Sequence, residues 1–387
     1  MRPRAVYIHI PFCTQKCHYC DFTAYVVDGQ PVDDYLTALE KEMKMITKEV
    51  PPGQIEAIFI GGGTPTVLTP TQMERLLMGI QKHFPEQSPS IEFTIEANPG
   101  TTTPELLTVM KKGGINRISF GVQTFRNTLL REIGRIHDNA DIKRSVQQAR
   151  QAGFQNISLD LMFGLPQQTV ADMEETLIEA MKLSPDHISC YSLKVEEGTL
   201  FHHLQERKEL PLPSEEEEFE MYQLVRSFLV QQGYHQYEVS NFAKPGYEST
   251  HNLTYWKNES YYGLGTGAHG YVKPTRYMNI KGVKEYIRQI EGEQRPIADQ
   301  FSERLEEEIE NFMMLGLRLL DGISKQTFYE RFGFDVDQIF QAEISDLINQ
   351  GFLYLEGDRI SLTEKGLIFG NHVFGTFIGT LDKIEHK

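Results

Sequence analysis

The sequence predicts an α/β fold whose first half is a partial parallel (βα)6 barrel. Short β-rich runs alternate six times with stretches of helical periodicity. The runs are rich in Ile, Val and Phe, as expected of strands covered on both faces. Consecutive βα units imply neighbouring parallel strands joined by right-handed crossovers. Because the units number six rather than eight, we expect the barrel to be open.

The individual elements follow from the apolar pattern. The predicted strands are residues 5–10, 56–60, 90–97, 117–121, 156–161 and 187–193. The predicted helices are residues 31–48, 71–83, 103–112, 139–152 and 170–182. In the first helix an apolar stripe falls on one face, as an amphipathic helix requires; it consists of Tyr35, Leu36, Leu39, Met43 and Ile46.

After the sixth strand the pattern changes. A helix at residues 214–232 is followed by a Gly-, Tyr- and His-rich stretch at 233–279, and the chain is predicted to be mostly helical from Ile297. A helix at 306–320, a helix at 346–352 and a small hairpin at 353–355 and 359–362 resemble a winged-helix module. We therefore predict a barrel at 1–235, an α+β extension at 236–296 and a mostly helical, winged-helix-like domain at 297–387.

Composition excludes several classes of protein. The 387 residues are 40% hydrophobic and 24% charged, as in ordinary globular proteins. The net charge is −16 without a cluster of Lys or Arg, which argues against a nucleic-acid partner. The apolar run at the N-terminus is too short for a signal peptide, and no stretch of about 18 apolar residues predicts a membrane span. We expect a cytoplasmic protein.

Three of the four cysteines lie close together. Cys13, Cys17 and Cys20 form a CxxxCxxC pattern directly after the first strand, and in a chain without a secretion signal this indicates metal or redox chemistry. Three thiolates on one loop can hold three irons of a [4Fe-4S] cluster and leave the fourth iron open to a small chelator. The alternative is a zinc site completed by His9 or His18. The fourth cysteine, Cys190, is expected to be a small core residue.

Several motifs together resemble a known family. They are the run YIHIPFC ending at Cys13, the CxxxCxxC spacing and the GGGTPT run at 61–66. They are similar to the coproporphyrinogen-dehydrogenase-like (HemN/HemW) family of the radical S-adenosylmethionine (SAM) superfamily, and in particular to its haem-chaperone HemW subgroup. The likeness covers nearly the whole chain. It implies a radical SAM barrel, with a [4Fe-4S] cluster on the three cysteines and SAM chelating the unique iron.

The resemblance also implies a set of SAM contacts, with Tyr19 against adenine, Arg135 on the carboxylate and Asp160 on the ribose. The full set is Tyr7, Tyr19, Gly62, Gly63, Thr64, Glu96, Gln123, Arg135 and Asp160. Several of these polar residues end or follow predicted strands, where ligands of α/β sheets bind. The bare glycines allow close backbone approach to a ligand. The alternatives are a plain βα turn for the glycines and a core position for Tyr7.

A second motif points to haem. The run from His251 to Trp256 matches the HNxxYW signature of the haem-binding subgroup and contains the only tryptophan. The haem-binding candidates are His251, Asn252, Tyr255, Trp256 and His269. Imidazole is a common axial ligand of haem iron, so His251 is the first candidate, with His269 behind it. The alternative is a loop histidine that only bonds backbone groups.

Two functions of different classes are consistent with these motifs. One is a haem chaperone that binds haem, SAM and the cluster and passes haem to an acceptor protein. The other is an oxygen-independent coproporphyrinogen III oxidase-type enzyme. That enzyme carries a further cysteine where this chain has Phe22, and an N-terminal arm where only six residues precede Tyr7, so we expect the chaperone. No catalytic residue is predicted, and cleavage of SAM is left open.

The resemblance further implies partners. They are haem, an acceptor of the membrane-bound respiratory type and a flavodoxin-like electron donor. Both a monomer and a cluster-dependent homodimer are consistent with the sequence.

Overall fold

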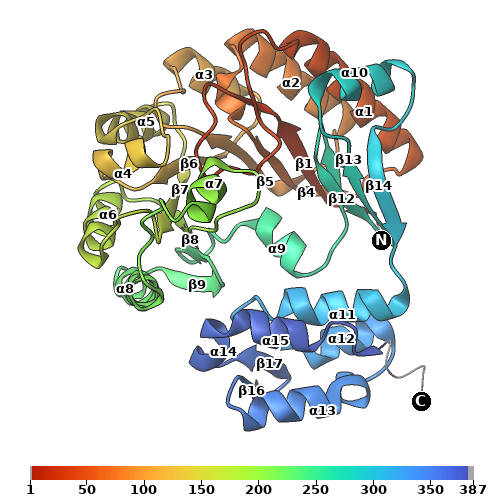
Figure 1. Ribbon diagram of the computed structural model, residues 1–387. Coiled ribbons are helices and arrows are strands. Elements are labelled where there is room, and N and C mark those ends of the chain that lie inside the picture. Colours follow the sequence, from red (N-terminus) through yellow and green to blue (C-terminus); the bar gives the residue numbers. More distant parts are fainter. Residues whose placement is uncertain (1, 382–387) are drawn as a thin grey trace.

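Six strand–helix repeats form the first half of the chain, as predicted (Figure 1). The computed structural model describes residues 2–381. The strands hydrogen-bond in parallel in the order β1-β4-β5-β6-β7-β8. They are β1 (Ala5–Ile10), β4 (Ile55–Gly62), β5 (Gln87–Ala97), β6 (Arg117–Gln123), β7 (Asn156–Phe163) and β8 (His187–Ser192). The helices between them are α1 (Val32–Glu49), α2 (Pro70–His83), α3 (Pro104–Lys112), α4 (Asn127–Glu132), α5 (Asn139–Gln151) and α6 (Val170–Lys182).

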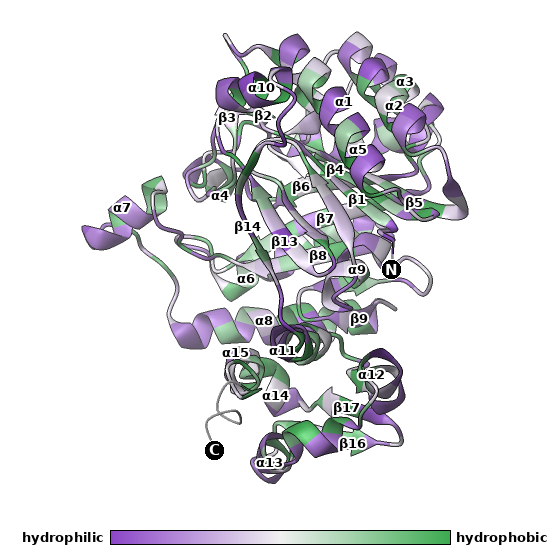
Figure 2. Cartoon of the chain, turned by 90° about the vertical axis from the view of Figure 1, so that its right-hand side faces the viewer, coloured by the Kyte–Doolittle hydropathy of each residue, from purple (hydrophilic) through white to green (hydrophobic). Residues whose placement is uncertain are grey.

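The starts of these helices are set by local sequence. Thr69, Asp138 and Thr169 cap α2, α5 and α6, and each forms a capping box with the residue three positions on. The apolar faces of the helices pack on the strands in one continuous core. Figure 2 shows the apolar residues gathered along the strands, with polar stretches on the outer helices.

The sheet is larger than the sequence predicts. The stretch at 233–302 adds strands at both edges, giving one open, mixed sheet in the order β14-β13-β12-β11-β1-β4-β5-β6-β7-β8-β10-β9. β11 pairs with β1 in parallel, whereas β12, β13 and β14 are antiparallel. These elements are β9 (His235–Glu238), β10 (Asn241–Ala243), α9 (Thr250–Trp256), β11 (Tyr261–Leu264), β12 (His269–Val272), β13 (Thr275–Asn279), α10 (Val283–Glu291) and β14 (Ile297–Ser302).

The start of the helical part is corrected accordingly. The chain was expected to be mostly helical from Ile297, but β14 pairs with β13 as far as Ser302. The change from sheet to helix therefore falls just before α11 (Leu305–Gly316), and the predicted helix 306–320 ends earlier, at Gly316. The predicted helix 346–352 is the end of a longer helix, α13 (Val336–Asn349).

The C-terminal part has a core of its own, below the sheet in Figure 1. Its three-stranded sheet has the order β15-β17-β16, and the predicted hairpin is confirmed. The remaining elements here are β15 (Ile323–Ser324), α12 (Lys325–Phe332), β16 (Leu353–Glu356), β17 (Arg359–Leu362), α14 (Glu364–Ile368) and α15 (Gly370–Thr376). No helix within residues 2–381 combines the length and apolarity needed to cross a membrane.

Two further helices follow β8. α8 (Glu215–Gln231) packs on α6, whereas α7 (Leu200–Glu206) stands away from the sheet at one margin in Figure 2. α7 is tied to the rest through Phe201, whose amide donates to the backbone carbonyl of His18 at 3.1 Å. Phe201 also packs in a small apolar cluster with Leu165 and Ile133.

Candidate cofactor site

The cysteine loop leaves the end of β1 and is anchored at several points. The short strand β2 (Phe12–Cys13) pairs with β3 (Tyr25–Val26), which closes the loop at its base. The amide of His18 donates to the carbonyl of Ile133 at 3.1 Å, and the His18 ring bonds the carbonyl of Glu132 at 2.8 Å. The loop is thereby fixed against the segment that follows α4.

One cavity of about 130 Å³ gathers the predicted cluster and SAM residues. It lies at the carboxyl ends of the parallel strands, where ligands of such sheets bind. Its lining includes Cys13, Cys17, Tyr19, Cys20, Gly62, Gly63, Thr64, Glu96, Asn98, Gln123, Arg135 and Asp160. Of the residues predicted for the cluster and SAM, Tyr7 alone does not line it.

Each cysteine sulfur has a hydrogen-bond donor. The Thr64 hydroxyl donates to Cys13 Sγ at 3.6 Å, and Arg135 donates to Cys17 Sγ at 3.5 Å. The backbone of Phe22 bonds the Cys20 thiol. Burial raises the pKa of Cys20 to about 11, so a free thiol there stays protonated, whereas coordination to a metal removes that proton. Donors of this kind also tune the potential of thiolate-bound iron.

The spacing of the sulfurs argues against a single zinc ion. Zn–S bonds of about 2.3 Å place tetrahedral sulfurs about 3.8 Å apart. Within residues 2–381, one group of three His, Cys, Asp or Glu ligand atoms lies within 4.8 Å of one another, and it consists of His202, His203 and Glu206. The three cysteine sulfurs are therefore spread more widely than one zinc ion requires, as suits a larger cluster.

The histidines offered to zinc make other hydrogen bonds, His9 through both ring nitrogens and His18 through Nδ1. His9 Nε2 bonds the carbonyl of Thr23 at 2.7 Å and its Nδ1 bonds the Tyr7 hydroxyl at 2.9 Å. His18 Nδ1 bonds the backbone of Glu132. The geometry therefore favours the cluster over zinc.

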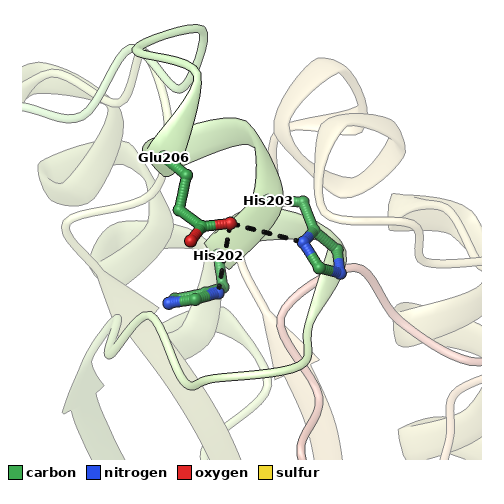
Figure 3. A group of neighbouring side chains, drawn as sticks. All are labelled: His202, His203 and Glu206. Atoms are coloured by element: carbon green, nitrogen blue, oxygen red, sulfur yellow. Dashed lines mark ion pairs between the residues drawn. The ribbon is translucent and has the colours of Figure 1, made fainter.

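The group of His202, His203 and Glu206 on α7 differs from the cysteine cavity because ion pairing explains it. Figure 3 shows His202 and His203 turned towards the Glu206 carboxylate, at 3.9 and 3.5 Å. All three residues come from one short surface helix, and pairing with Glu206 accounts for their approach. We assign no metal to them.

The glycine loop leaves no room for side chains. A Cβ on Gly61 would lie 2.8 Å from a Glu96 carboxylate oxygen, and one on Gly63 would lie 2.7 Å from the Phe12 carbonyl and 3.0 Å from Cys13 Sγ. Gly62 has φ +112° and its amide donates to Glu96 at 3.0 Å. The run is therefore more than a plain turn, because it brings bare backbone up to the cysteine loop and to a strand-end carboxylate.

Two carboxyl groups, those of Glu96 and Asp160, line the cavity. Burial and the neighbouring Asp160 raise the pKa of Glu96 to about 7. Burial also raises the pKa of Asp160, which is opposed by hydrogen bonds from Ser189 and Ser119, the latter at 3.0 Å. Such groups can accept hydrogen bonds from the amino group and hydroxyls of a polar ligand.

Arg135 supplies the cationic side of the cavity. It donates to Cys17, to the carbonyl of Gly121 and to Asn98 Oδ1, the last at 2.6 Å. Asn98 in turn donates to the Thr64 hydroxyl at 3.1 Å. Asn98 was not among the predicted contacts, although its place two residues after Glu96 at the end of β5 was a usable signal. A carboxylate and an amine can be held at opposite sides of this cavity.

A second cavity of about 460 Å³ adjoins the first. The two share Phe22, Gly62 and Glu96. Tyr7 lies here, with its ring 6.2 Å from that of Phe59. Other residues lining it are His9, Tyr255, Tyr261, His269 and Lys281.

The haem candidates are brought together only in part: Tyr255 and His269 line the second cavity and His251 bonds Tyr255, whereas Asn252 and Trp256 lie elsewhere on α9. The HNxxYW run forms helix α9 and not a loop, so His251 and Tyr255, four positions apart, share a face that points into the barrel. His251 is buried, with Nε2 2.7 Å from the Tyr255 hydroxyl and its ring 5.0 Å from that of Phe59. Asn252 and Trp256 are half-buried elsewhere on α9, and His269 is exposed on β12. Nδ1 of His251 is buried without a hydrogen-bond partner among the described residues, and ligation of haem iron by His251 stays a prediction.

The burial of His251 predicts acid sensitivity. Burial lowers its pKa from 6.5 to about 3, so its contribution to stability is complete above pH 6.5 and is lost as the pH falls towards 3. Between about pH 7.5 and about pH 5.5 we expect His251 to reduce the free energy of unfolding by about 1 kcal/mol. Urea unfolding of the wild type and of His251→Gln at both pH values checks this. Equal pH dependence in the two proteins would contradict it.

Comparison with known proteins identifies the family of the chain. The radical SAM superfamily model matches residues 7–180 and the HemN C-terminal domain model matches residues 304–369. Heme chaperone HemW of Bacillus subtilis is 47% identical over 378 residues, covering 98% of this chain and 100% of the relative. The protein of the same name from Escherichia coli is 34% identical over 390 residues, covering 97% and 98%.

A solved structure supports the fold alone. Coproporphyrinogen III oxidase (HemN) from Escherichia coli, described as a radical SAM enzyme, superposes with a TM-score of 0.85 over 97% of this chain and 90% of its own, at 24% identity. The fold and the cysteine cavity together define a radical SAM protein. With the full-length relatives, the chain belongs to the HemW family of that superfamily.

Proposed function

We propose that this protein is a haem chaperone, which binds haem together with a SAM-coordinated [4Fe-4S] cluster and passes the haem to an acceptor protein. The observation that carries the proposal is the full-length identity, up to 47%, with relatives named heme chaperone HemW. The HNxxYW run on α9 and Phe22 in place of a further cysteine support it.

Cys13, Cys17 and Cys20 would hold the cluster, and Arg135, Glu96 and Asp160 would orient SAM. The cluster supplies one-electron chemistry when it is bound. Around it, Thr64, Arg135 and the Phe22 backbone donate to the sulfurs, and Arg135 offers a carboxylate partner. The haem acceptor is proposed to be a membrane-bound respiratory protein and the electron donor a flavodoxin-like protein.

The alternative is a coproporphyrinogen oxidase-type enzyme. The second cavity favours it, because a space of about 460 Å³ beside the SAM residues could admit an organic substrate. Phe22 argues against the enzyme. It is 61% exposed, lines both cavities and occupies the position at which the enzyme carries a further cysteine.

One experiment separates the two. The full chain is reconstituted anaerobically with iron and sulfide and divided into two samples. One is titrated with haem and mixed with an apo haem protein; we expect a stoichiometric haem complex and transfer to the acceptor. The other receives SAM, a strong reductant and coproporphyrinogen. Turnover to protoporphyrinogen would favour the enzyme, and failure to bind haem would reject the chaperone.

A further inference from the structure

A third cavity, of about 460 Å³, lies between the outside of the barrel and the C-terminal part. It shares no lining residue with the two cavities of the cofactor site. Its volume is typical of a small-molecule site. Its wall combines apolar and aromatic side chains with one guanidinium group; the principal residues are Phe163, Cys190, Tyr222, Arg318, Leu367 and Phe374.

Arg318 is held rigidly at the junction of the two parts. Its amide donates to Leu315 at the end of α11, and two residues later Leu320 donates to the carbonyl of Tyr237 on β9, both at 3.1 Å. Its guanidinium carbon lies 4.6 Å from the ring centre of Phe374 and 5.2 Å from that of Trp256. The cation is therefore sandwiched between α15 and the last residue of α9.

Within residues 2–381 the guanidinium of Arg318 has the Glu238 carboxylate as an electrostatic neighbour but makes no direct ion pair. No ion pair or side-chain hydrogen bond involves it, and its Nε is fully buried without an acceptor. The nearby Glu238 carboxylate already accepts from Ser240, at 3.2 Å, and from Asn241. The Glu238 carboxylate attracts the half-buried guanidinium without forming an ion pair with it, so a ligand carboxylate could add the direct pairing that Arg318 lacks.

Neighbouring arginines at the same junction provide a contrast. Arg331 also stacks on aromatic rings, yet it pairs with Glu308 at 3.0 Å. Arg226 stacks on Tyr222 and pairs with Glu364 at 2.9 Å. Pairing with a glutamate is thus available at this junction, and Arg318 alone of these three lacks it within the described chain.

We propose that this cavity binds haem, with a propionate on Arg318 and the porphyrin along the aromatic wall. The inference rests on the proposed haem-chaperone function and gives that function a site. A planar guanidinium pairs with a carboxylate through two parallel hydrogen bonds, and aromatic side chains suit a flat apolar body. Glu215 and Glu218 also line the cavity, on the first turn of α8, so the carboxylates of the ligand are directed away from them and towards Arg318.

The site also accounts for the position of the HNxxYW run. The Trp256 ring, on α9, lies against the guanidinium of Arg318, while His251 lies inside the barrel. The motif then acts here by positioning Arg318 through Trp256, and not through an imidazole ligand to iron.

The test compares haem with haem dimethyl ester, in which both propionates are blocked. Soret titrations use the full chain and its Arg318→Gln variant. We expect the wild type to prefer haem by about tenfold or more, and Arg318→Gln to lose this preference while binding the ester as before. Arg318→Lys should restore part of the preference. Arg331→Gln weakens the same junction but does not line the cavity, so it should leave the preference for haem over the ester unchanged.

A second variant guards against misfolding of Arg318→Gln. Asn371→Trp fills the cavity from α15 and removes no hydrogen bond within the described chain, so it should weaken both ligands together. Equal affinities of the wild type, Arg318→Gln and Asn371→Trp for haem would overturn the site but leave the chaperone function intact. Absence of haem binding by the wild type would reject the chaperone function itself.

Discussion

Replacing Cys17 by alanine is expected to abolish the iron–sulfur cluster. The wild type, reconstituted without oxygen, should hold about four iron and four sulfide ions per chain. Cys17 would supply one of three sulfur ligands, and its sulfur accepts a hydrogen bond from Arg135 at 3.5 Å. With two thiolates left, bound iron should fall close to zero. Iron and sulfide counts, with electron spin resonance before and after addition of SAM, measure the effect.

Cys190 provides the matched control. It is buried on β8 and lies outside the cysteine cavity, as the sequence predicts for a core residue. Cys190→Ala should keep the full iron content and lower the free energy of unfolding by about 1 kcal/mol through lost packing. If Cys17→Ala retained its iron, or if the wild type bound a single zinc ion, the cluster assignment would be wrong.

Removing the Glu92 carboxylate is expected to cause the largest loss of stability. Glu92 is buried on β5 and accepts three hydrogen bonds at the start of α9. They come from the Ser249 hydroxyl at 3.1 Å and from the amides of Thr250 at 3.0 Å and His251 at 3.1 Å. Glu92→Leu would leave these donors buried without acceptors, at about 1–3 kcal/mol each, so we expect a total near 3 kcal/mol or more.

Urea unfolding measures this loss. Glu92→Gln keeps one acceptor oxygen and should lose roughly half as much. Glu56→Leu removes an exposed carboxylate that pairs with Arg4 on the surface, and should cost about 0.5 kcal/mol or less. A Glu92→Leu protein as stable as Glu56→Leu would show that α9 does not depend on the carboxylate.

The barrel could be predicted because its elements are long and locally specified. The predicted strand 5–10 coincides with β1 and the predicted helix 170–182 with α6. In these segments apolar periodicity and a cap agree, as with Thr169 and Asp172 at the start of α6. Local preference and tertiary packing then favour the same structure.

Two of the added strands, β11 and β12, were not located because a glycine interrupts the apolar pattern of each. β11 and β12 contain Gly263 and Gly270. A Cβ on Gly270 would lie 2.2 Å from a ring atom of Tyr277, and one on Gly263 would lie 1.8 Å from the carbonyl of His269. The glycines are thus required by contacts with other strands, and these contacts are not visible in a short window of sequence.

In the candidate site, too, some residues could be predicted from the sequence and others could not. Several of the predicted SAM residues, such as Glu96 and Asp160, lie at or near strand ends, so the barrel topology predicts that they meet. Four of the five haem candidates lie on a seven-residue helix whose first amides donate to Glu92, more than 150 positions away in the chain, and His269 lies on β12. Arg117 was also missed; it is buried inside the barrel and donates to Thr94 at 3.4 Å. No local pattern marks it.

The path from α9 to the cysteine loop is short. β11 begins soon after α9 and hydrogen-bonds to β1, and β1 runs directly into Cys13. A ligand that binds at α9 can have different affinities when the cysteine loop is loaded with its cofactor and when it is empty. Any such coupling is reciprocal by thermodynamic necessity. A haem affinity that changes by some factor when the iron–sulfur cofactor is loaded therefore requires that haem change the affinity for that cofactor by the same factor.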